Sequence, residues 1–188
     1  MRESQVYQPQ NQMTLWWLGR PASPVKIGQL SFVPSMRGVG LRYDAHWLTH
    51  GFAISEDLPL RDIDFLPTEK DTAVGALDDA RPDRWGERVI GQLDRPPRTS
   101  LMEFLYFAGD DRFGALGVSL KDDSCHPHQT GPLPRLSALN AIDDTIVRLL
   151  AQDKLDDRLI RLVKLGASMG GTRPKALIQH GGAHWVLK

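Results

Sequence analysis

Residues 166–188 read GASMGGTRPKALIQHGGAHWVLK and begin with a loop that is rich in glycine. Glycine reaches backbone angles that are closed to other residues, so this loop can turn successive N–H groups inward around an anion. Arg173 and Lys175 add fixed positive charge beside the loop. This combination favours a loop that binds phosphate groups.

A β-hairpin is predicted directly after the loop. The apolar run 176–178 is too short for a helix, and Gly181-Gly182 suits a tight hairpin turn. The second strand, at 183–187, ends at Lys188. A glycine loop followed by a lysine on a strand is one way in which proteins hold a nucleoside triphosphate.

The helix expected before the loop decides which kind of phosphate loop this can be. An amphipathic pattern predicts a helix from 153 or 154 to 165, with Gly166 just past its end. Walker and dinucleotide-binding loops place their glycines before a helix, whereas these glycines follow a helix and precede a strand. The order that remains is kinase-like, with a glycine loop over the phosphates and a lysine on a nearby strand. A purely structural turn is the alternative.

Two helices are predicted in the middle of the chain. The first, at about 82–93, is indicated by an aspartate near the cap, by Pro82 in the first turn and by an apolar stripe. The stripe consists of Trp85, Val89, Ile90 and Leu93. The second helix, at about 100–109, begins at a capping box in which Ser100 and Glu103 each satisfy a backbone N–H.

The first third of the chain is predicted to form short strands. They are separated by Gly, Pro and Ser, and are expected at 14–19, 25–33, 41–48 and 51–55. Gly28 interrupts the alternation of the second strand and predicts a bulge. Large aromatic rings dominate burial, so Trp16, Trp17 and Trp47 are expected to be core or interface residues rather than a ligand cage.

The predicted fold class is α+β, with an N-terminal small antiparallel β-sheet or partial barrel, then helices, then a terminal glycine-loop β-hairpin. A further strand is expected at 115–120 and a further helix at about 136–152. We expect a β-rich unit at 1–120, a Pro-rich loop at 121–135, and a helical segment with the loop and hairpin at 136–188.

Composition excludes several classes of function. The 188 residues include 23 Lys+Arg and 23 Asp+Glu, so the formal net charge is zero and a general nucleic-acid coat is not expected. The single Cys125 rules out an intrachain disulfide and favours a reducing cytoplasm. No apolar run approaches the roughly 20 residues that span a bilayer, and the polar N-terminus lacks a signal-peptide core. A cytoplasmic protein that does not enter the membrane is predicted.

The Asp, Cys and His residues that could bind a metal are predicted to be surface residues instead. Asp110-Asp111 has no further ligand nearby and is expected to be a polar helix-to-strand loop. The Cys-His-Pro-His run at 125–128 lacks the second half of any zinc spacing. His180 and His184 are expected to be exposed on the hairpin, so no metal site is assigned.

The strings Ser-Met-Gly-Gly-Thr-Arg-Pro-Lys-Ala at 168–176 and Trp-Val-Leu-Lys at 185–188 resemble the glycine-loop region of the HipA family. This family consists of bacterial serine/threonine kinases of toxin–antitoxin systems. The resemblance extends upstream to Ala-Arg-Pro-Asp-Arg-Trp-Gly at 80–86, to Phe-Gly-Ala-Leu-Gly at 113–117 and, more faintly, to 25–32.

The resemblance implies roles for particular residues. Those expected over the ATP phosphates are Gly170, Gly171, Thr172, Arg173, Pro174 and Lys175. Lys188 would be the strand lysine that pairs with the α- and β-phosphates, and Ser168 matches the loop serine that family members phosphorylate on themselves. A phosphoserine adds about −1.5 to −2 charge, so we hypothesise that it competes for the phosphate donors and expels the loop.

No residue before Lys188 matches the family's catalytic aspartate, its Mg²⁺ ligands or its C-lobe, so no catalytic residue is assigned. The resemblance implies the N-terminal region of a kinase that is inactive alone, with ATP and Mg²⁺ expected for the complete enzyme. Implied partners are the C-lobe, a helix-turn-helix antitoxin of the HipB type, DNA only through that antitoxin, and an unidentified protein substrate. The main alternative is a free-standing, non-enzymatic subdomain that regulates a separate kinase chain. A small β-rich ligand-binding protein is a third interpretation, with only the tryptophans in its favour.

Overall fold

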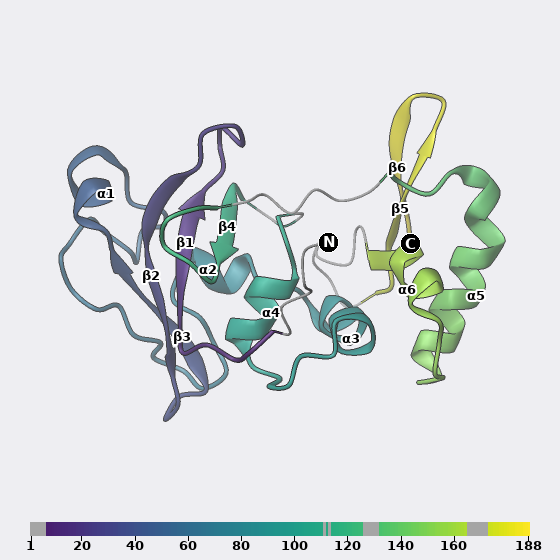
Figure 1. Cartoon of the computed structure of the whole chain (residues 1–188), viewed down its shortest axis with the longest axis horizontal. Coiled ribbons are helices and arrows are strands. Elements are labelled where there is room, and N and C mark those ends of the chain that lie inside the picture. The colour runs from purple at the N-terminus through teal and green to yellow at the C-terminus, as the bar shows by residue number, and fades with distance from the viewer. Residues whose placement is uncertain (1–6, 111, 113, 126–131, 165–172) are drawn as a thin grey trace.

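A computed structural model describes residues 7–110, 112, 114–125, 132–164 and 173–188. Figure 1 shows a four-stranded sheet at one end of the molecule, and α5 (Leu139–Leu150), α6 (Asp157–Lys164) and a terminal hairpin at the other. Between these two parts lies α3 (Arg84–Leu93). The predicted α+β class, with a sheet followed by helices and a hairpin, is confirmed. In the described part of the chain, no helix is both long and apolar enough to cross a bilayer.

The sheet is antiparallel throughout, with the strand order β3-β2-β1-β4. Its strands are β1 (Gln12–Trp17), β2 (Val25–Val33), β3 (Gly38–Tyr43) and β4 (Leu116–Ser119). β4 follows the central helices in the chain and pairs with β1, so it returns the chain to the sheet that the first strands began.

The bulge predicted in β2 is confirmed. The register between β1 and β2 shifts at Ile27, which has no Cα partner on β1 in the described pairing. A Cβ atom at the neighbouring Gly28 would lie 2.1 Å from the carbonyl oxygen of Arg42 on β3. Because no side chain fits there, glycine is required where β2 lies against the backbone of β3.

The second half of the predicted third strand is instead a helix, α1 (Ala45–His50). The side chain of Asp44 accepts a hydrogen bond from the His46 backbone N–H at 2.9 Å and caps this helix. Trp47 is 3% exposed and packs into the core. The strand prediction is wrong here because the local cap turns the chain and the helical turn buries the indole.

The strand predicted at 51–55 is also wrong. Gly51 ends α1 by donating its backbone N–H to the Trp47 carbonyl oxygen at 2.7 Å. The residues that follow form bends and turns and pair with no strand. Their short apolar run reflects packing around the tryptophan ring rather than membership of the sheet.

The apolar stripe predicted for α3 is confirmed. All four of its members are buried, namely Trp85, Val89, Ile90 and Leu93. The cap differs from the prediction, because Asp83 is the N-cap residue and Pro82 lies before it rather than in the first turn. The aspartates further upstream belong to a separate short helix, α2 (Ala76–Asp79).

The capping box predicted at the start of α4 (Leu101–Phe107) is wrong. Ser100 is the N-cap residue, but its side chain makes no hydrogen bond to the helix backbone. Its hydroxyl donates to the carboxylate of Glu103, which also accepts hydrogen bonds from Tyr7 and Arg98. The buried carboxylate is held by these side chains, and among the described residues it accepts no hydrogen bond from the Ser100 backbone N–H.

Two buried clusters hold the two parts of the molecule. The first lies between the sheet and the helices α1, α2 and α4 and includes Leu15, Ile27, Leu41, Leu77, Met102 and Leu105. Trp16 and Trp47 are buried and Trp17 packs on the first cluster, so the core interpretation of these rings is confirmed. The second cluster joins the α3 stripe to α5, α6 and the hairpin, through Ile142, Leu149, Ile160, Val163, Ala176 and Ile178.

The domain boundaries at 120 and 135 stay a prediction.

The terminal hairpin is confirmed, with β5 (Ala176–His180) paired antiparallel to β6 (Ala183–Leu187). Gly181 and Gly182 have φ angles of 60° and 78°. Two successive residues with positive φ match the right-handed twist of the flanking strands, which explains the Gly-Gly sequence at this turn.

The turn provides a first test of the fold. We expect Gly182→Val to lower the stability of the hairpin by about 1–2 kcal/mol, because a branched residue is strained at positive φ. Hydrogen exchange of the β5 amides should be faster in this variant. Gly181→Asn is the control, since asparagine tolerates positive φ and should leave exchange nearly unchanged. Equal exchange rates in the valine variant and the native chain would contradict the prediction.

Candidate nucleotide-loop site

The predicted loop residues fall partly outside the described part of the chain. Those that lie outside it are Gly166, Ser168, Gly170, Gly171 and Thr172. The described candidates are Arg173, Pro174, Lys175 and Lys188. The described part of the site therefore consists of the residues that flank 165–172 and of α3, the helix that these residues contact.

Two of the predicted lysines flank the open end of the hairpin. Ala176 on β5 is paired with Leu187 on β6, and this is the last pair at that end. Lys175 directly precedes β5 and Lys188 directly follows β6. Arg173 precedes this end by two residues, and the side chains of Arg173 and Lys188 are exposed. Three predicted cations therefore stand at or just before the open end of the hairpin.

Lys175 is buried, with 8% of its surface exposed. Its Nζ donates to the carbonyl oxygen of Arg173 at 3.1 Å and lies 3.7 Å from Oδ2 of Asp83. Its own carbonyl oxygen accepts a hydrogen bond from Nε1 of Trp85 at 3.1 Å. Both the backbone and the side chain of Lys175 are therefore attached to the N-terminal end of α3.

Asp83 connects the start of α3 to this lysine. Its Oδ1 accepts a hydrogen bond from the Gly86 backbone N–H at 2.9 Å, as expected for an N-cap. Its Oδ2 is buried and accepts no hydrogen bond among the described residues. The ion pair found for this oxygen is with the Lys175 ammonium. The Asp83 carboxylate thus caps α3 and also pairs with Lys175, which directly precedes β5.

The other flank of residues 165–172 is attached to the opposite end of α3. Lys164 is the last residue of α6, and its Nζ lies 3.1 and 3.0 Å from the two carboxylate oxygens of Asp94. Asp94 is the C-cap residue of α3. A helix of ten residues is about 15 Å long. The described residues on the two sides of 165–172 are therefore attached to opposite ends of α3.

A polar cavity of about 580 Å³ lies next to the N-terminal end of α3. Residues that line it include Arg37, Arg81, Asp83, Arg84, Glu87 and Arg98. Burial raises the pKa of Glu87, and the charge of Arg81 partly offsets this rise. Arginines and carboxylates alternate around the cavity, so it carries no strong field of one sign.

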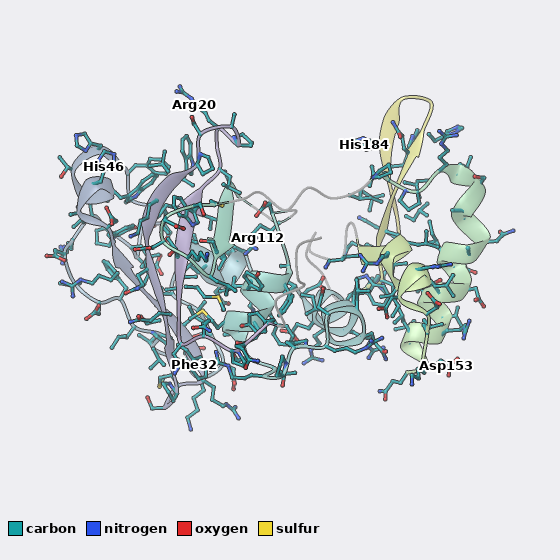
Figure 2. All side chains as sticks on the ribbon, in the orientation of Figure 1. Arg20, Phe32, His46, Arg112, Asp153 and His184 are labelled. Atoms are coloured by element: carbon teal, nitrogen blue, oxygen red, sulfur yellow. The ribbon has the colours of Figure 1, made fainter. Side chains whose placement is uncertain are left out.

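The candidate metal ligands do not converge in the described residues. His180 and His184 are exposed on the hairpin, as predicted, and His184 is labelled on it in Figure 2. Asp111, His126 and His128 lie outside the described residues. Burial, with the charge of Asp110, raises the pKa of the Cys125 thiol to about 11, so this thiol stays protonated at neutral pH. Among the described side chains, no three His, Cys, Asp or Glu are placed to hold a metal ion.

The described elements define an α+β protein in which a small sheet is joined, through α3, to helices and a glycine-loop hairpin. The model of the HipA N-terminal domain family matches residues 22–119, which is more than half of the chain. The chain therefore belongs to this family, and the resemblance seen in the sequence is confirmed. No curated protein matches the chain. The matched region includes α3 and ends before the glycine loop.

Several residues of the site have no predicted role in the sequence. Asp83 and Trp85 stand in the motif that supports the family resemblance, but spacing alone does not reveal that they contact Lys175. The Asp94–Lys164 pair has no sequence signal, because its partners are 70 residues apart. Such contacts depend on the packing of α3 against α6 and β5, which local patterns do not specify.

Proposed function

We propose that the chain is the N-terminal region of a HipA-like serine/threonine kinase of a bacterial toxin–antitoxin system. In this proposal residues 170–175 lie over the phosphates of Mg-ATP, and Lys188 is the strand lysine that pairs with them. The single observation that supports it is the hairpin pairing, because Lys175 directly precedes β5 and Lys188 directly follows β6 at the open end of the hairpin. Family membership supports the same assignment.

The described cations suit a phosphate better than a neutral ligand. Lys188 and Arg173 are exposed and can approach an oxyanion without breaking a described ion pair. In this proposal the region contributes phosphate binding and the C-lobe contributes the catalytic base, so phosphoryl transfer requires the C-lobe. We propose the same C-lobe, a helix-turn-helix antitoxin and a cytoplasmic location as the setting in which this region works. Ser168 stays the proposed site of autophosphorylation.

Lys188 provides the direct test. We expect Lys188→Ala to weaken binding of Mg-ATP by about tenfold or more, because a hydrogen bond to a charged group is lost. Isothermal titration calorimetry on the 188-residue chain measures this affinity. Lys154→Ala removes an equal charge from an exposed lysine and should leave the affinity unchanged. Absence of ATP binding in the native chain, or equal losses in both variants, would reject the proposal.

A second candidate function is a non-enzymatic subdomain that binds and regulates a separate kinase chain. The observation that favours it is the family match, which covers β2, β3, β4 and the central helices and leaves the glycine loop outside. Co-purification of the 188-residue chain with a separately encoded kinase, with no ATP binding of its own, would support this second function over the first.

A further inference from the structure

Lys175 is one of the residues proposed to contact ATP, yet a carboxylate already holds its ammonium group. The Lys175 side chain is 10% exposed and that of Asp83 is 14% exposed, with 3.7 Å between Nζ and Oδ2. Both charges are largely removed from water, where an ion pair is stronger than on the surface. A phosphate that recruits this lysine must therefore draw it away from Asp83.

The two partners differ in how firmly they are held. Asp83 is fixed because its Oδ1 caps α3 through the Gly86 N–H. The Lys175 backbone is fixed because Trp85 donates to its carbonyl oxygen. The lysine side chain, by contrast, has a flexible four-carbon stem. Movement from Asp83 to a phosphate thus rotates the Lys175 side chain and breaks its hydrogen bond to the Arg173 carbonyl oxygen, while the start of β5 stays in place.

We propose that Asp83 is a positioning residue that competes with the nucleotide phosphates for Lys175 and so sets the ATP affinity of the loop. This inference rests on the proposed nucleotide function. When Lys175 turns to a phosphate, the largely buried Asp83 loses the ammonium that faces it and keeps the hydrogen bond from the Gly86 backbone N–H. Loss of a counter-charge from a largely buried carboxylate is costly, and this cost is subtracted from the binding free energy of ATP.

Asp83→Asn isolates this effect. Asparagine caps helices as well as aspartate does, so α3 keeps its cap while the charge that faces Lys175 is removed. We expect Mg-ATP to bind this variant about tenfold more tightly than the native chain, within the usual range for coupling between sites. Titration calorimetry on the 188-residue chain measures the change. Asp79→Asn, at an exposed aspartate, is the matched control and should not alter the affinity.

The same substitution in a chain that already carries Lys175→Met separates two explanations. Asp83 could compete with the phosphates for Lys175, or its charge could simply repel them. In a Lys175→Met chain, Asp83→Asn should no longer tighten ATP binding, because the lysine that it releases is absent. If Asp83 only repelled phosphate through space, its neutralisation would tighten binding equally in both backgrounds. That result, or no tightening in the native background, would overturn the inference.

Two further comparisons distinguish a loss of folding from a loss of ATP binding. Circular dichroism reports whether each variant is folded, and Asp83→Ser, which also retains a capping side chain, replaces the asparagine variant if that one unfolds. If neither the native chain nor any Asp83 variant binds ATP, the proposed function is rejected and the inference falls with it. If the native chain binds and Asp83→Asn does not bind more tightly, the inference alone is rejected.

Discussion

Glu103→Gln is expected to lower the free energy of unfolding by about 1.5–3 kcal/mol, because Arg98, whose side chain is 27% exposed, loses the charged partner of its hydrogen bonds. Glu103 is 0% exposed. Its carboxylate accepts hydrogen bonds from Nε and Nη2 of Arg98 at 2.9 and 2.8 Å and from the Tyr7 hydroxyl at 2.8 Å. The Arg98 guanidinium also lies over the ring of Phe32, labelled in Figure 2, at 4.6 Å from its centre. The network thus joins α4 to the start of the chain and to β2.

Urea unfolding of the native chain and the variant measures this change. Glu87→Gln is the matched control, because Glu87 is half-buried and no hydrogen bond to its side chain is found among the described residues. We expect the control to cost much less, or to stabilise slightly, since burial disfavours the Glu87 charge. Similar losses in the two variants would show that the Glu103 network has no special role.

The pH dependence of the Glu103 effect follows from its pKa. Burial by itself raises the pKa of Glu103, but the hydrogen bonds from Arg98, Ser100 and Tyr7 lower it by more, so it lies below its ordinary value of 4.5. A group with a lowered pKa adds stability that is fully present above the unfolded value and is lost as the pH falls through the folded value. The stability difference between the native chain and Glu103→Gln should therefore be complete near neutral pH and shrink below pH 4.5.

Trp85→Ala is expected to cost about 3–5 kcal/mol of unfolding free energy, as is typical when a large buried ring is truncated. Trp85 is 3% exposed and belongs to the second cluster, where α3, α6 and β5 meet. Its Nε1 also satisfies the Lys175 carbonyl oxygen. Loss of the ring should release the start of β5, so the β5 amides should lose most of their protection from hydrogen exchange.

Two companion variants separate the ring from the hydrogen bond. Trp85→Phe keeps an aromatic ring but leaves the Lys175 carbonyl oxygen unpaired, which we expect to cost about 1–3 kcal/mol. Trp185→Ala truncates a tryptophan that is 55% exposed on β6, and such surface changes usually stay within about 0.5 kcal/mol. If Trp185→Ala proved as damaging as Trp85→Ala, the second cluster would not be centred on α3.

Local chemistry explains where the sequence predictions succeed. The Gly-Gly turn, the bulge beside Gly28 and the α3 stripe each depend on a few neighbouring residues whose conformational limits act in any context. The errors occur where a sequence pattern competes with another interaction. At 45–48 a strand pattern loses to the Asp44 cap, and at Glu103 a capping-box pattern loses to hydrogen bonds from the side chains of Arg98 and Tyr7.

The amino-acid sequence by itself determined the α+β order of elements, the glycine-loop hairpin and the membership of the HipA N-terminal domain family, which the match at 22–119 confirms. Only the tertiary structure decided that α3 holds both flanks of the loop, through Asp83 with Lys175 and through Asp94 with Lys164. The physical reason is the range of the interactions. Turns and stripes arise between residues a few positions apart, whereas these ion pairs join residues that only the packing of the second cluster brings together.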